Sequence, residues 1–158
     1  GADKVSVNSA AIADHSLIKD GSTEFGNQCV MLSIDHKIGS SGSQEVFTNN
    51  GSSTTGMSPL DWALRGQELG AGEILLTSID SEGSQNGFDL ETIAQVSDAV
   101  DIPVIAAGGA GTLADLVSAI NVGHASAVAA ASIFHFTDQS VIKAHSYMKQ
   151  AGIDVRMS

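Results

Sequence analysis

The sequence predicts an α/β fold built on a parallel sheet. Five short apolar runs rich in β-branched residues recur along the chain, and each is followed by a segment with helical spacing. Such runs are typical of strands buried on both faces, and strands that alternate with helices need crossover connections, which make the sheet parallel. The expected strands are Lys4 to Asn8, Gln28 to Asp35, Glu73 to Ser78, Pro103 to Ala107 and Ala125 to Ser132.

Capping signals mark four of the helices. Ser58 as N-cap, followed by Pro59 at the first helical position, opens a helix that Gly70 ends. The apolar stripe expected on this helix consists of Leu60, Ala63, Leu64 and Leu69. The other three helices are expected to run from Asp89 to about Val100, from Thr112 to Val122 and from Ser140 toward Gly152.

One long interruption, from His36 to Met57, is rich in Gly, Ser, Asn and Thr. Because Asn50-Gly51 is a strong turn signal, a small hairpin is expected around Glu45 to Thr48. A loop of this length at a strand end is usually functional or disordered.

Composition excludes several classes of protein. The 158 residues are about the length of one domain, and 42% hydrophobic residues with a mean hydropathy of +0.12 exclude a disordered chain. A net charge of −11 disfavours nucleic acids and anionic membranes as partners. Cys29 is the single cysteine, which excludes an intramolecular disulfide and suits a cytoplasmic location. No run approaches the roughly 20 apolar residues that a membrane span needs.

Five strand–helix units in 158 residues, taken alone, favour a doubly wound, flavodoxin-like sheet, because an eight-stranded barrel takes about 250 residues. In either architecture, functional groups gather at the carboxyl ends of the strands. Asp35 and Asp80 stand at the ends of the second and third expected strands, where a carboxylate could act as general acid or base. A carboxylate that only caps the following loop is the alternative, and this pattern alone favours it.

Small residues at four strand ends are suited to binding a phosphate. Free backbone N–H groups and helix dipoles attract an anion there, and only small side chains let it reach the backbone. Any one of these segments is more readily explained as an ordinary turn, but four on one edge of the sheet make an anion site more specific. The segments are Asn8-Ser9, Gly83, Gly108-Gly109 and Ala131-Ser132.

The sequence lacks the motifs that bind metal ions or nucleotide cofactors. The five histidines show no metal-binding spacing, and neither GxGxxG nor GxxxxGK[ST] occurs. No metal and no cofactor are therefore expected.

Four motifs taken together resemble one family: IDHK (34–37), GAGEILLTSID (70–80), GGAG (108–111) and AASIFHF (130–136). They are similar to the cyclase subunit of imidazole glycerol phosphate synthase, from histidine biosynthesis. The resemblance implies a TIM (βα)8 barrel, of which this chain matches strands four to eight. It replaces the doubly wound sheet by a partial barrel, in which residues 1–158 form one incomplete domain that lacks the first three βα units.

The resemblance also implies a reaction. In that family, a partner glutaminase supplies ammonia, which attacks a bis-phosphorylated phosphoribulosyl-formimino aminoimidazole carboxamide ribonucleotide. Cyclisation with cleavage then gives imidazole glycerol phosphate and aminoimidazole carboxamide ribonucleotide. Two phosphates need two anion sites, which agrees with the small residues at the strand ends.

Site residues follow from the resemblance by motif. Asp35 matches a catalytic aspartate, and Asn8 and Ser9 match one phosphate site. The other phosphate site is matched by Glu82, Gly83, Gly108, Gly109, Ala131 and Ser132. Four polar residues match the opposite end of the barrel, where the family docks the glutaminase and gates ammonia: Asp3, Lys4, Gln28 and Glu73. Solvated strand ends or a structural salt bridge are the alternative for these four residues.

Departures from the family pattern leave other functions open. The family's other catalytic aspartate lies on its first strand, which this chain lacks, so the fragment alone is expected to be inactive. Glu82 replaces the usual Asp, while Ser81 and Ser52-Ser53 stand where basic residues are common, which weakens anion binding. A divergent paralogue acting on another phosphosugar, or a non-catalytic barrel fragment, remain the alternatives.

Five strands cannot close at the tilt and shear of an eight-stranded barrel. The first and last expected strands would leave two open edges, which are expected to pair with a missing N-terminal segment or with a second copy in an oligomer.

Overall fold

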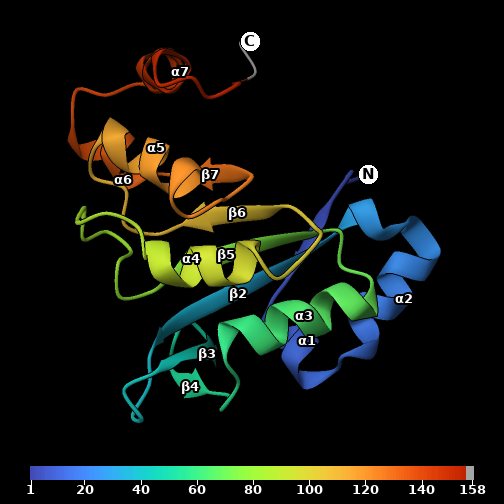
Figure 1. The fold of residues 1–158 in the computed structure, drawn as a ribbon. Coiled ribbons are helices and arrows are strands. Elements are labelled where there is room, and N and C mark those ends of the chain that lie inside the picture. Colours follow the sequence, from blue (N-terminus) through green and yellow to red (C-terminus); the bar gives the residue numbers. More distant parts are fainter. Residues whose placement is uncertain (156–158) are drawn as a thin grey trace.

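A computed structural model describes residues 1–155, which form one sheet with helices packed against it (Figure 1). The strands are β1 (Val5–Val7), β2 (Val30–Ile38), β3 (Gln44–Thr48), β4 (Ser53–Thr54), β5 (Glu73–Ser78), β6 (Val104–Ala107) and β7 (Ala127–Ala129). The helices are α1 (Ser9–Ala13), α2 (Ser16–Phe25), α3 (Pro59–Leu69), α4 (Leu90–Ser97), α5 (Leu113–Asn121), α6 (Ser132–Phe136) and α7 (Val141–Gln150), with a 3-10 turn at Asn27–Cys29. No helix in this described part is long and apolar enough to cross a bilayer.

Five parallel strands follow one another in chain order, as β1, β2, β5, β6 and β7. The doubly wound order favoured by spacing alone is therefore wrong, because a doubly wound sheet reverses its strand order at a switch point. Consecutive order is that of a βα barrel, and within residues 1–155 β1 pairs only with β2 and β7 only with β6. The predicted α/β partial barrel is confirmed, as an open arc of five parallel strands.

Burial alternates along the central strands. On β2, Leu32 and Ile34 are fully buried, whereas their neighbours Met31 and Ser33 are partly exposed. The expectation of burial on both faces is therefore wrong. The buried side chains pack beneath helices such as α3 and α4, which lie across the front of the sheet in Figure 1. The other face lines the inside of the arc and is left partly open, because only closure of a barrel would bury it.

The four predicted caps are confirmed. Ser58, Asp89, Thr112 and Ser140 each accept a hydrogen bond from a backbone N–H in the first turn of the next helix. Helices α4 and α5 end at Ser97 and Asn121, three residues and one residue before the expected ends.

The apolar stripe predicted for α3 is partly wrong. Trp62, Ala63 and Gly66 are buried, whereas Leu64 is 36% exposed. Gly66 sets this orientation, since a Cβ atom there would collide with the Leu32 side chain of β2. The helix therefore packs on the face that carries Trp62, Ala63 and Gly66, and turns Leu64 outward.

The predicted hairpin is present as β3 and β4, and its turn has positive φ angles at Asn49, Asn50 and Gly51. The structure corrects the end of the preceding strand: β2 continues past Asp35 to Ile38, because β3 pairs antiparallel with it from Asp35 onward. The last parallel strand is shorter than expected, since α6 already begins at Ser132.

Candidate functional site

Asp35 lies on the open face of β2, near the carboxyl edge of the parallel strands. In the sheet register it is opposite Thr77 of β5 and Phe47 of β3. Asn8, which follows β1, donates a hydrogen bond from Nδ2 to Oδ2 of Asp35 at 2.9 Å, and a longer one to Oγ of Ser33 at 3.4 Å. The sequence analysis gave Asn8 and Asp35 different roles, and the fold brings their side chains into contact.

Ser9 joins this group through the hairpin. Its Oγ accepts a hydrogen bond from the backbone N of Asn49 at 3.0 Å, so the turn between β3 and β4 rests against the start of α1. The long interruption in the sequence therefore folds back over the carboxyl edge, beside the side chains expected to hold one phosphate.

A cavity of about 200 Å³ lies farther along the same edge. Its lining comes from the loops that follow β5, β6 and β7. Five of the residues predicted for the second phosphate line it: Glu82, Gly108, Gly109, Ala131 and Ser132. Gly83 is exposed and is not part of the lining, so its neighbour Glu82 represents that loop.

Close backbone packing requires a glycine in this cavity wall. Gly109 has φ +111°, and a Cβ atom there would overlap the carbonyl oxygen of Gly87. The Gly87 N–H in turn donates to the Gly109 carbonyl oxygen at 2.8 Å. The loop after β5 is thereby fastened to the loop after β6, and the resulting wall presents backbone groups and small side chains of the kind that can accommodate a phosphate.

Lys37 is a residue of this edge that the sequence analysis did not single out. It follows Asp35 by two positions on β2 and so lies on the same face. Its ammonium donates to the Gly51 carbonyl oxygen at 2.9 Å and lies 4.5 Å from the centroid of the Phe47 ring. The alternation of side chains within IDHK was the signal that could have identified it.

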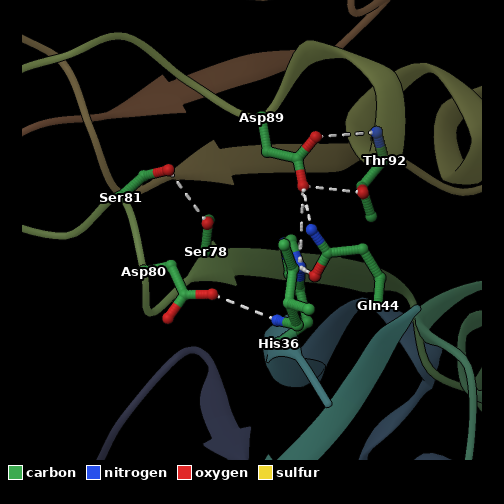
Figure 2. Close-up of polar contacts among 8 residues, drawn as sticks. His36, Gln44, Ser78, Asp80, Ser81, Asp89 and Thr92 are labelled. Atoms are coloured by element: carbon green, nitrogen blue, oxygen red, sulfur yellow. Dashed lines mark hydrogen bonds and ion pairs between the residues drawn. The ribbon is translucent and has the colours of Figure 1, made fainter. Parts of the chain in front are cut away.

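Asp80 lies just after β5 and contacts the neighbouring strand β2. Its Oδ2 accepts a hydrogen bond from the backbone N of Ile38 at 3.1 Å, so it binds the end of β2. Nearby, Ser78 Oγ donates to Ser81 Oγ at 3.1 Å (Figure 2). The Asp80 bond runs to β2 and not to the loop that follows Asp80, so both expected roles of Asp80, general acid or base and loop cap, stay predictions.

A buried polar network lies behind Asp35 and was also missed. His36, Gln44, Asp89 and Thr92 are joined by hydrogen bonds across β2, β3 and the start of α4 (Figure 2). His36 is only 1% exposed. Nothing in the sequence indicated the network, because its members come from three separate segments.

The opposite end of the sheet carries the other predicted polar residues. Lys4 and Glu73 form an ion pair that spans β2, from the start of β1 to the start of β5. Asp3 and Gln28 are exposed at the same end, just before β1 and β2.

Within residues 1–155, no three His, Cys, Asp or Glu side chains are grouped to hold a metal ion.

Comparison with known proteins agrees with this arrangement. The histidine biosynthesis protein family matches residues 1–140 of the chain. The imidazole glycerol phosphate synthase subunit HisF of Dehalococcoides mccartyi is 48% identical over 157 residues, which make up 99% of this chain and 62% of that protein. These findings confirm the resemblance expected from the motifs, although the chain spans only about three fifths of that relative. The chain belongs to the histidine biosynthesis protein family.

Proposed function

We propose that this chain is the larger part of a cyclase of the imidazole glycerol phosphate synthase type. Its substrate is the bis-phosphorylated phosphoribulosyl-formimino aminoimidazole carboxamide ribonucleotide. Its products are imidazole glycerol phosphate and aminoimidazole carboxamide ribonucleotide. The proposal rests on one observation above all: the Asp35–Asn8 pair and the cavity lined by Gly109 and Ser132 occur on the same edge of one parallel sheet.

Each group on that edge has a chemical role in the proposal. Asp35 transfers a proton as the nitrogen of ammonia bonds to the substrate and the ring closes, and Asn8 orients its carboxylate through the 2.9 Å hydrogen bond. The cavity beside Gly108, Gly109 and Ser132 holds one phosphate. Asn8 and Ser9 contribute to the site of the other phosphate, at the far side of the Asp35 carboxylate.

Glu82 and Ala131 line the same cavity, and Gly83 adjoins it through its neighbour Glu82. Glu82 lines the cavity with an acidic side chain, so the phosphate there is bound by backbone groups rather than by a local cation. This arrangement fits a substrate that is held at both ends, with neither phosphate dominating the affinity.

The other end of the sheet is proposed to receive ammonia. A glutaminase subunit docks there, next to Asp3 and Gln28, and the Lys4–Glu73 ion pair controls passage along the inside of the arc. Such an enzyme would work in the cytoplasm, where the thiol of Cys29 stays reduced.

Activity requires more than the residues of this chain. The inner face of the sheet is partly open, and β1 and β7 each have one edge without a partner strand in the described part. We place a further segment of the protein, which brings the second catalytic carboxylate, or a second copy of the chain against these edges.

Substituting Asp35 tests the proposal. In the complete gene product that carries this chain, Asp35→Asn should lower kcat for ammonium-dependent formation of imidazole glycerol phosphate by orders of magnitude, because the amide cannot exchange the proton. KM should change little, since the amide keeps the size and the hydrogen-bonding oxygen of the carboxylate. The measurement is steady-state kinetics with saturating ammonium.

Asp20→Asn is the matched control, because Asp20 is exposed on α2, away from the carboxyl edge. It should leave both constants unchanged. A kcat for Asp35→Asn close to that of the control would remove Asp35 from the mechanism.

A further inference from the structure

We propose that His36, Gln44 and Asp89 form a relay that positions Asp35 relative to the loop carrying Glu82. The inference rests on the proposed function, because it assigns these residues to the same site. None of the three touches the open face of the sheet in the way Asp35 does, so they act through other residues and are positioning residues.

The relay is continuous and partly buried. Nδ1 of His36 lies 2.9 Å from Oε1 of Gln44, and Nε2 of Gln44 donates to Oδ2 of Asp89 at 2.8 Å. Thr92 completes it, since its Oγ1 donates to the same Asp89 oxygen at 2.7 Å and its backbone N to the other oxygen at 3.1 Å. His36 is 1% exposed and Thr92 5%, whereas the Asp89 side chain is 17% exposed, so water is excluded chiefly from the His36 end of the network.

The network determines where the imidazole carries its proton. A carboxylate can only accept, so Gln44 must turn its amide nitrogen toward Asp89 and its oxygen toward His36. Nδ1 of His36 must therefore carry a proton, which it donates to Gln44. Donors and acceptors then alternate without a mismatch from His36 to Asp89, and the network has one arrangement rather than two.

One end of the relay controls the backbone of Asp35. His36 shares a peptide unit with Asp35, and side chains alternate along a strand, so His36 points to the buried face while Asp35 points to the open one. The His36 carbonyl oxygen also accepts from the backbone N of Ile79 at 2.8 Å, where β5 ends. A shift of the imidazole would therefore tilt the strand that presents the Asp35 carboxylate.

The other end controls the loop between β5 and α4. Asp89 caps α4 and closes this loop, which begins at Ile79 and carries Glu82 on the cavity wall. In Figure 2, the side chains of His36, Gln44 and Asp89 connect β2 to the start of α4. The relay thus spans the distance from the proposed proton-transfer group to one wall of the proposed phosphate cavity.

Stability alone does not account for such a network. Burying a histidine, an amide and a carboxylate costs solvation energy that their mutual hydrogen bonds only offset, whereas apolar side chains of similar volume would fill the same space at no such cost. Directional bonds differ from apolar packing in fixing one relative placement of the elements. Catalysis depends on that placement, because a displacement of about 1 Å can lower a rate up to about 100-fold.

Variants at Gln44 and His36 separate positioning from stability. Gln44→Leu in the complete gene product removes the central amide and leaves the His36 Nδ1–H without its acceptor, while Asp89 keeps its hydrogen bonds from Thr92. It should lower kcat for ammonium-dependent turnover by about 10- to 100-fold and change KM by less than about threefold. It should also lower the midpoint of urea unfolding, since a buried donor has lost its acceptor.

The double variant His36→Leu/Gln44→Leu is decisive. Replacing both partners by apolar side chains removes the orphaned donor, so the unfolding midpoint should return toward the wild-type value. If the relay positions Asp35, kcat should remain low although stability is regained. Recovery of kcat together with stability would overturn the inference, because the network would then serve stability only.

Gln95→Leu is the matched control, since Gln95 is exposed on α4, outside the relay. It should leave kcat, KM and the unfolding midpoint unchanged. Absence of turnover in the wild-type protein would overturn the proposed function itself. A wild-type protein that turns over, with a double variant that turns over equally well, would overturn the relay alone.

Discussion

Individual glycines on the carboxyl edge differ in why they are required. Gly109 combines a φ of +111° with a Cβ position that overlaps the Gly87 carbonyl oxygen. Gly83 has φ +71°, but the space around its Cβ position is open. The first glycine is therefore required by close backbone packing, and the second only by its backbone conformation.

These two glycines predict a pair of unequal effects. Gly83→Ala should destabilise the protein by about 1 kcal/mol, the cost of a left-handed conformation for a residue with a side chain. Gly109→Ala should cost about 3 kcal/mol or more, because steric overlap adds to the conformational strain. Urea unfolding of the complete gene product, followed by circular dichroism, measures both. Equal losses at the two positions would contradict the packing explanation.

Contacts between neighbouring residues were only partly predictable. Asp35 and Asn8 could be chosen from sequence because each directly follows or ends an apolar run, where functional groups of parallel sheets gather. Their 2.9 Å contact could not, since it depends on β1 pairing with β2 in a particular register. For the same reason, the sequence could not predict that His36 and Asp89 belong to one network, since they are 53 positions apart in the chain.

Between elements, the Lys4–Glu73 ion pair links the starts of β1 and β5 across β2. The two side chains are 45% and 21% exposed. An exposed pair of this kind contributes at most about 1 kcal/mol of stability. We therefore expect its main effect to be on the proposed passage of ammonia along the inside of the arc.

Breaking this ion pair should affect the two nitrogen sources differently. Lys4→Met in the complete gene product, assayed with the proposed glutaminase partner, should leave ammonium-dependent turnover nearly unchanged. With glutamine as the nitrogen source, the amount of product formed per glutamine hydrolysed should fall severalfold, because the proposed passage no longer retains ammonia inside the arc. Both rates are measured with the same product assay, and the free energy of unfolding should change by less than about 1 kcal/mol.

The reversed pair Lys4→Glu/Glu73→Lys restores opposite charges at the two positions. It should therefore regain much of the product formed per glutamine hydrolysed. Lys19→Met, on the exposed surface of α2, is the control for loss of a positive charge. Equal losses with ammonium and glutamine in Lys4→Met would contradict a role in ammonia passage.

At the scale of the whole molecule, the arc of five parallel strands leaves apolar surface accessible. A groove of about 1260 Å³ runs beside the outer strand β7, between that strand and α7, and its lining includes Val128, Phe134 and Met148. At the other edge Val5 of β1 is 50% exposed. Unpaired strand edges next to apolar surface favour association with another chain or segment.

The chain 1–158 on its own is therefore expected to self-associate. Size-exclusion chromatography with light scattering should give a mass above that of one 16.1 kDa chain, while the complete gene product should bury the same edges within its own barrel. A monomeric chain 1–158 that unfolds in a single cooperative transition would contradict the prediction.

The sequence predicts the five parallel strands and four of the helices without knowledge of the fold. Five apolar runs, four helix caps and the Asn50-Gly51 turn are local signals, and each has its counterpart in the structure. Its motifs also indicated the family, because residues at strand ends keep their order along the chain whatever the strands do in space.

The order and pairing of the strands, by contrast, became known from the three-dimensional structure. Consecutive parallel order replaced the doubly wound order, and β2 was extended to Ile38 by its pairing with β3. The same pairing brought Gln44 beside His36 and completed the buried network with Asp89. Such contacts depend on strand order and register, which are set by long-range packing of whole faces and leave no local trace in the sequence.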